Sequence, residues 1–206
     1  MIKKGLWIFL VVLAIMIGLY PALYFFTDQT GGLLSSKSAA LLSNTLWNMG
    51  FYTHIILGGI ALLIGWTQFS SKIRIRNLRL HKQLGKVYVV CVMLSSVAAI
   101  GIGFFATGGV ITATGFICLG ITWFYTTLKA YVHIKNRKIT EHQKMMIYSY
   151  AACFTAVTLR IWLPLLVMIF GDFITAYTIV AWLSWVPNII VASLITRRLA
   201  PQQILN

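Results

Sequence analysis

The stretch LWIFLVVLAIMIGLY, residues 6–20, contains no charged residue, and the uncharged run extends over residues 5–26. A bilayer core about 30 Å thick is crossed by roughly 20 predominantly apolar residues in a helix. The run therefore predicts a transmembrane helix. It ends in the bulky YPALYFF rather than in a small-residue cleavage site, so we expect an uncleaved helix rather than a signal peptide.

Five further stretches have the length and apolar character of membrane spans: residues 47–69, 87–106, 109–132, 146–170 and 173–195. No long polar segment remains for a soluble catalytic domain. The sequence predicts an all-α integral membrane protein with six transmembrane helices, forming a single transmembrane domain over residues 1–206.

The composition agrees with this fold class. Hydrophobic residues make up 59% of the 206 residues and charged residues 10%, whereas soluble domains have about 45–50% and about 25%. This excludes a soluble enzyme, a disordered tail and a secreted disulfide scaffold. With only 3 acidic residues, hydrolases that work through two carboxylates are excluded too. The three cysteines lie in three different spans without a CxxC pair, which favours buried small side chains over a disulfide or zinc site.

The 17 Lys and Arg residues are distributed asymmetrically. All but Lys37 and Arg160 lie before the first span, between the second and third, around the connection of the fourth and fifth, or after the sixth. Cations gather on the cytoplasmic side of membrane proteins. We therefore expect a protein of the cell membrane with both termini cytoplasmic.

The segment SSKIRIRNLRLHKQLGK, residues 70–86, alternates basic and aliphatic residues. Such a segment suits the membrane interface, with its cations on anionic lipid headgroups. Because topology already explains these cations, we expect lipid rather than nucleic acid as the partner.

Polar and small residues follow one face of the second span. Steps of three or four residues connect His54, Gly58, Ala61, Gly65 and Gln68. Helix packing explains the glycines, whereas packing does not require His54. Ionisable residues at membrane depth are default site candidates.

The fifth span carries a similar face, composed of His142, Met146, Ser149, Cys153, Ala156 and Arg160. His142 and Arg160 are separated by 18 residues, roughly 27 Å of helix, so they lie near opposite membrane surfaces. We expect Arg160 at the depth of His54, as either a structural clamp or a ligand-binding group. Asp172 is a candidate partner for it near the outer surface.

The third span begins near His81, whose face continues through Gly85, Tyr88, Val92, Ser95 and Ala99. His81 and His142 are the better candidates at the cytoplasmic surface, whereas His133 lies among loop cations. Spans two to five are expected to form a four-helix core, with spans one and six outside it. In span six, Pro187 frees a backbone carbonyl that Asn188 can help to satisfy.

Three stretches of the sequence resemble the motifs of a known family. They are HIILGGIALLIGWTQF, LHKQLGKVYV and EHQKMMIYSYAACFTAVTLR. Over residues 50–165 the chain resembles a family of bacterial multi-pass membrane proteins catalogued as a domain of unknown function. The family's pattern is HxxxG followed by GxxQF, then HRxxGxxY, then HRxWM with a distal LR. The residues of this chain that match it are His54, Gly58, Gly65, Gln68, Phe69, His81, Gly85, Tyr88, His142, Met146 and Arg160. Lys82 and Gln143 replace two arginines of the pattern, and Met145 replaces its Trp. The resemblance implies a membrane protein of undetermined activity.

Three functional hypotheses fit these residues. The first is a b-type haem or quinone-linked redox protein, with cofactor-binding residues His81, His142, Tyr88 and Met146 on the cytoplasmic side. No metal other than haem iron is expected. The second is a binding or transport protein for a small solute or lipid, using an outer cavity lined by His54, Arg160 and Gln68. The third is an assembly factor whose polar faces receive another membrane subunit.

Overall fold

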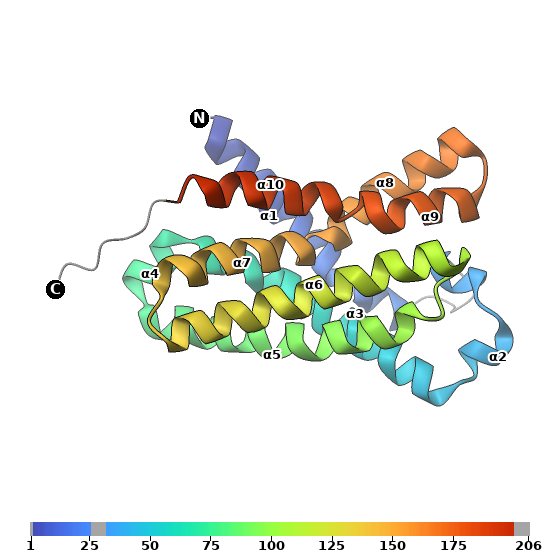
Figure 1. Cartoon of the computed structure of the whole chain (residues 1–206), viewed down its shortest axis with the longest axis horizontal. Helices are drawn as coiled ribbons and strands as arrows, with labels where there is room; N and C mark the ends of the chain where they lie inside the picture. Colours follow the sequence, from blue (N-terminus) through green and yellow to red (C-terminus); the bar gives the residue numbers. More distant parts are fainter. Residues whose placement is uncertain (1, 26–31, 200–206) are drawn as a thin grey trace.

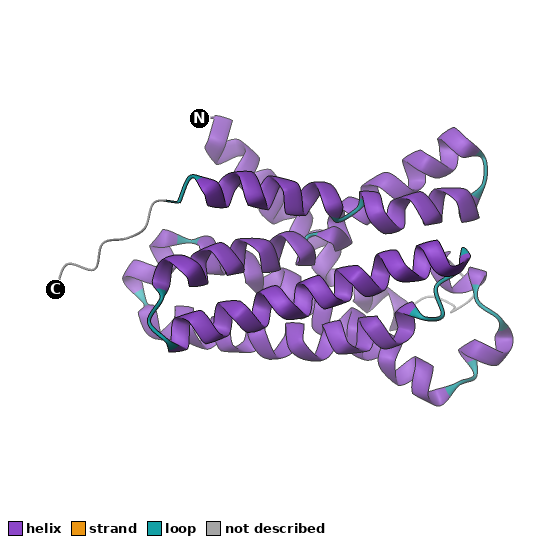
Figure 2. Cartoon of the chain, viewed as in Figure 1, coloured by secondary structure: helices purple, strands orange, loops and turns teal. Residues whose placement is uncertain are grey.

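A computed structural model describes residues 2–25 and 32–199, and every regular element in these ranges is helical. Figure 2 shows helices joined by short loops. The long helices are α1 (Ile2–Leu19), α3 (Thr45–Gly65), α5 (Leu78–Gly103), α6 (Gly109–Lys135), α7 (Ile139–Cys153), α8 (Thr155–Phe170), α9 (Phe173–Leu183) and α10 (Val186–Arg197).

Six helical stretches of the described chain are long and apolar enough to cross a membrane: Lys4–Leu23, Thr45–Phe69, Leu78–Gly103, Gly109–Lys135, Ile139–Phe170 and Phe173–Arg197. The prediction of six transmembrane helices in an all-α fold is thus confirmed. Many large apolar side chains remain exposed on these helices, as expected for surfaces that face lipid.

The third and fifth helices begin earlier than predicted. The third starts at Leu78 rather than at residue 87, because the Asn77 side chain accepts the backbone N–H of Leu80 and caps the helix. The fifth begins at Ile139 rather than at 146. Their first turns are polar and continue beyond the apolar stretch. Residue 26, the last of the first predicted span, lies outside the described residues.

The fifth and sixth spans are each broken. The break between α7 and α8 lies at Phe154, and that between α9 and α10 at Ser184 and Trp185. Pro187 occupies the first turn of α10, where its missing N–H costs no hydrogen bond. The Asn188 amide donates to the carbonyls of Ala151 and Ser184, at 3.3 and 3.1 Å, so one side chain serves both breaks.

Helices α3, α5, α6 and α7 pack around one another, with α5 against α3 and α6, and α7 against α6 and α3. The fourth helix of this bundle, α7, ends at Cys153. The chain leaves the bundle there, because α8 turns away to pack on α9 (Figure 1). Helix α1 lies across α3, where Gly18 and Gly59 let the two backbones approach.

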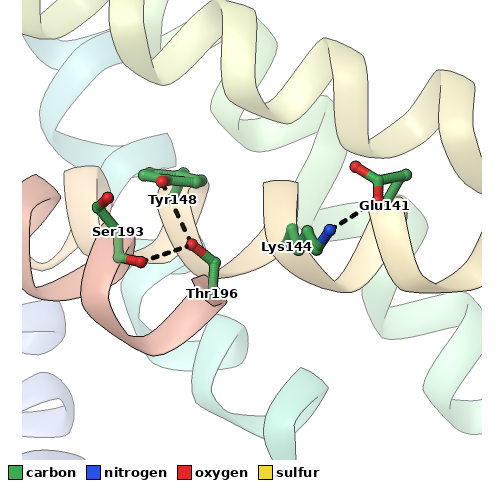
Figure 3. A network of polar contacts seen from close by, with 5 residues as sticks. All are labelled: Glu141, Lys144, Tyr148, Ser193 and Thr196. Carbon is green, nitrogen blue, oxygen red and sulfur yellow. Dashed lines mark hydrogen bonds and ion pairs between the residues drawn. The ribbon is translucent and has the colours of Figure 1, made fainter. Parts of the chain in front are cut away.

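Helix α10 runs along α7. Tyr148 of α7 receives a hydrogen bond from the Thr196 hydroxyl at 3.2 Å, and Thr196 also bonds Ser193 of its own helix (Figure 3). On the same face of α7, Lys144 and Glu141 form an ion pair of 2.8 Å.

One end of the bundle holds α4 (Ser71–Arg76), the turn between α6 and α7, and the end of α10 (Figure 1). We call it the basic end, because the cations of residues 70–86 and 129–144 lie there. The opposite end holds α2 (Ala39–Leu42) and the turn between α8 and α9.

Candidate functional site

His142 lies in the first turn of α7, at the basic end. Its Nδ1 is 2.8 Å from the backbone oxygen of Ala130 on α6. A carbonyl oxygen only accepts, so Nδ1 carries the proton and donates. In the neutral imidazole, Nε2 therefore keeps a lone pair for a metal ion or a proton.

His81 lies in the first turns of α5, at the same end. Its Nδ1 is buried and has no hydrogen-bond partner in the described part of the chain. His142 is within electrostatic range of it. Because α5 and α7 both pack on α3 and α6, the two helices stand across the bundle from each other. The fold thus places the two histidines singled out in the sequence at the same end of the bundle, within electrostatic range of each other.

No group of three or more His, Cys, Asp or Glu residues suited to a metal ion occurs in the described ranges. A pair of imidazoles on facing helices is the ligand set that haem iron takes in helical bundles. His81 and His142 are the imidazoles in the first turns of α5 and α7 that could hold such an iron.

Tyr88 and Met146 lie deeper in the bundle. Met146 is buried one turn after His142. Tyr88 is fully buried, and its hydroxyl is 2.8 Å from Ser149 Oγ. Tyr88 lies seven residues after His81, about 10 Å along the helix. The Tyr88 hydroxyl is therefore engaged with protein, two turns away from the histidine pair.

The hydrogen bonds around Tyr88 have a fixed direction. The Thr127 hydroxyl donates to the Trp123 carbonyl at 2.7 Å, so the 2.6 Å contact with Ser149 places the Ser149 proton toward Thr127. Ser149 then accepts from Tyr88. This chain joins α5, α7 and α6. Thr127 and Trp123 are not among the candidates that the sequence indicates. The adjacent Thr126 and Thr127 in an apolar helix are the feature of the sequence that points to this position.

Glycines make room at this level. A Cβ on Gly65 would stand 2.5 Å from the Tyr150 ring and 2.8 Å from the Tyr88 ring. One on Gly58 would stand 3.2 Å from Ser95 Oγ. The neighbouring helices thus fill the small-residue face of α3 at these two positions, as helix packing predicts.

His54 and Ser95 meet in the half of the bundle away from the basic end. Ser95 Oγ donates to the His54 carbonyl at 2.9 Å, and His54 Nδ1 lies 3.0 Å from Ser95 Oγ and 3.2 Å from the Ser95 carbonyl. Both atoms near Nδ1 act as acceptors there, so Nδ1 donates. Nε2 keeps its lone pair and has no partner in the described residues. The Trp123 ring stands edge-on to the imidazole, with centroids 6.5 Å apart.

Arg160 lies on α8, within electrostatic range of His54. Its guanidinium stacks over the Tyr20 ring at 4.3 Å, and Nη1 donates to the Ala156 carbonyl at 2.9 Å. The electrostatic interaction with His54 is consistent with the predicted similar depth of the two residues, whereas their role as a ligand site stays a prediction. Asp172 caps α9 by accepting the Thr175 backbone N–H at 2.7 Å.

Gln68 does not join this pair. It lies 14 residues after His54, about 21 Å along the helix, in the 3-10 turn η3 (Trp66–Phe69). Its Oε1 would be 3.0 Å from a Cβ on Gly85 of α5. The expectation that Gln68 lines the outer cavity is therefore wrong in position: sharing a helix face with His54 says nothing about depth.

Comparison with known proteins places most of the chain in one family of membrane proteins. A family model described as a predicted membrane protein (DUF2306) matches residues 51–196, which include His54, His81, His142 and Arg160. No curated protein and no solved structure matches the chain. The match covers well over half of the chain, so the protein belongs to this family of multi-pass membrane proteins of unknown function.

Proposed function

We propose that the protein is a b-type haem redox protein of the membrane, with His81 and His142 as the axial ligands. The observation that carries the proposal is the 2.8 Å bond from His142 Nδ1 to the Ala130 carbonyl. Ligating histidines commonly donate their other ring N–H to a backbone carbonyl, which fixes the ring and raises its basicity. In this arrangement Nε2 of His142 would be the atom left free to hold haem iron.

The surroundings of the pair support the same function. His81 stands across the bundle from His142, with a buried ring nitrogen that has no partner among the described residues. Burial favours neutral imidazoles, and the neutral ring is the ligating form. Bound haem would supply one-electron chemistry at this end of the bundle.

The test is a visible spectrum of the full-length protein, expressed with added haem precursor and purified. We expect a Soret band and split alpha and beta bands after dithionite reduction. His81→Ala and His142→Ala should each abolish the low-spin spectrum, whereas His133→Ala, with its histidine in the last turn of α6, should retain it. Folded protein without porphyrin or iron would overturn the proposal.

A second candidate function uses the half of the bundle away from the basic end. The hydrogen bonds between His54 and Ser95 leave Nε2 of His54 as an acceptor, and Arg160 supplies a cation within electrostatic range of His54. A quinone headgroup or a small anionic solute matches this pair, because its oxygen accepts from a guanidinium and a quinol hydroxyl donates to an imidazole. Thermal stabilisation by a short-chain quinone analogue tests it. Arg160→Gln should lose the stabilisation, and a full response in His54→Ala with Arg160→Gln would reject the site.

A further inference from the structure

We propose that α4 and the first turns of α5 form a binding surface for anionic phospholipid headgroups, which we call the α4 surface. It comprises Lys72, Arg74, Arg76, Arg79, Lys82 and Lys86, all exposed, together with the exposed Ile75, Leu78 and Leu80. The proposal is independent of haem and of the candidate site around His54.

The local structure fixes this surface in place. Ser70 caps α4 by accepting the Ile73 N–H, and Asn77 caps α5 by accepting the Leu80 N–H at 2.9 Å. The partly buried Ile73 is turned toward the bundle, whereas Ile75 is 81% exposed between Arg74 and Arg76. Two caps and one anchoring side chain therefore hold an exposed isoleucine between two arginines.

The mixture of side chains selects the partner. Residues 70–86 contain no acid, so the surface attracts anions. Ile75, Leu78 and Leu80 would face water unless an apolar phase meets them, and α5 enters its apolar stretch soon afterwards. A membrane interface offers phosphates to the cations and acyl chains to the aliphatic groups at adjacent depths. Duplex or single-stranded nucleic acid supplies the phosphates without the apolar layer.

The position of α4 agrees with an interfacial role. Figure 1 shows it at the basic end, beside the first turns of α5 and at the level of the turn between α6 and α7. It packs mainly on α5 and η3, and its cations and Ile75 are exposed, so its outer side is available to lipid.

The experiment titrates full-length protein in dodecyl maltoside with phosphatidylglycerol, phosphatidylcholine or a short single-stranded oligonucleotide, following the melting temperature and the bound lipid by native mass spectrometry. One variant combines Lys72→Gln, Arg74→Gln and Arg76→Gln. Its control removes the same charge at the same end through Lys129→Gln, Lys135→Gln and Lys138→Gln. Each cation that contacts a bound headgroup changes affinity roughly fivefold, so the α4 variant should lose about a hundredfold for phosphatidylglycerol. The three control lysines lie off the α4 surface, so the proposal gives them no contact with that headgroup.

We expect the control to lose at least tenfold less, and wild type to prefer phosphatidylglycerol over phosphatidylcholine. Ile75→Ser should also weaken phosphatidylglycerol binding, whereas Val110→Ser should not, since Val110 is 78% exposed at the opposite end. Because these single changes lie on the surface, they test the proposal even if the triple variant misfolds. Equal losses in the two triple variants, no headgroup preference, or an oligonucleotide bound as tightly as lipid would each overturn it.

Discussion

His54 and Ser95 are joined by reciprocal hydrogen bonds between α3 and α5: the serine hydroxyl donates to the histidine carbonyl, and the imidazole donates to the serine. The pair ties two helices and fixes the histidine tautomer. The contact therefore has a structural role, which substitution of Ser95 tests.

Ser95→Ala should destabilise the protein by about 1–3 kcal/mol, because it removes the hydroxyl that donates to the His54 carbonyl and accepts from the imidazole. Ser96→Ala is the matched control, since Ser96 is equally buried but bonds only its own helix, at Val92 and Met93. Chemical unfolding in mixed micelles measures both. Equal losses would show that the contact between helices contributes nothing beyond a local hydrogen bond.

Gly65→Ala should destabilise by about 1–3 kcal/mol, because the new methyl group would enter the space of the Tyr150 and Tyr88 rings. Gly101→Ala provides the comparison. A Cβ at Gly101 has no atom within 4 Å, so this change should stabilise α5 by roughly 0.5–1 kcal/mol. Thermal unfolding in detergent tests the opposite signs, and a neutral Gly65→Ala would contradict the close packing.

The hydrogen-bond chain through Ser149 predicts an order of effects. Ser149→Ala leaves two buried hydroxyls, those of Tyr88 and Thr127, without their shared partner. Tyr88→Phe removes only the first donor, so its cost should be near 1 kcal/mol and smaller than that of Ser149→Ala. The double variant should cost less than the sum of the two changes. Strict additivity in unfolding free energy would argue against a connected chain.

Sequence patterns predicted the helices well because apolar length is a local property. The break at Phe154 was missed, since a count of apolar residues contains no information on where a helix bends. The early start of α5 had a local signal, the capping Asn77. Shared helix faces correctly grouped His142 with Met146 and Ser149. A shared face does not give the depth of a residue in the membrane, and for that reason it grouped Gln68 with His54 although Gln68 lies far along the helix. It also does not indicate partners on other helices, such as Thr127.

Asp172 predicts an acid-sensitive α9. Hydrogen bonds from the Thr175 side chain and then from its backbone N–H hold the pKa of the Asp172 carboxyl below its usual value. The lowered pKa means that the stabilising contribution is present above the unfolded pKa and disappears as pH falls through the folded pKa. The protection factors of the α9 amides, taken relative to the intrinsic exchange rate at each pH, should therefore fall in acid, from about pH 4 downward. Asp172→Asn should flatten that dependence, while an unchanged profile would assign it to other groups.

The two helix breaks should depend on Asn188. Its amide donates to the Ala151 and Ser184 carbonyls and lies 3.1 Å from Thr158 Oγ1, which itself bonds the Ser184 carbonyl. Asn188→Ala leaves these acceptors in an apolar environment, so we expect a loss of about 1–3 kcal/mol.

Hydrogen exchange should rise at both breaks together in this variant, because one side chain serves the two of them. Thr114→Val is the control: the Thr114 hydroxyl is exposed and bonds only its own helix, so its loss should stay within about 0.5 kcal/mol. If hydrogen exchange rose at the break after α9 but not at the break after α7, the hydrogen bond from Asn188 to the Ala151 carbonyl would not contribute to stability. The two broken spans would then open independently of each other.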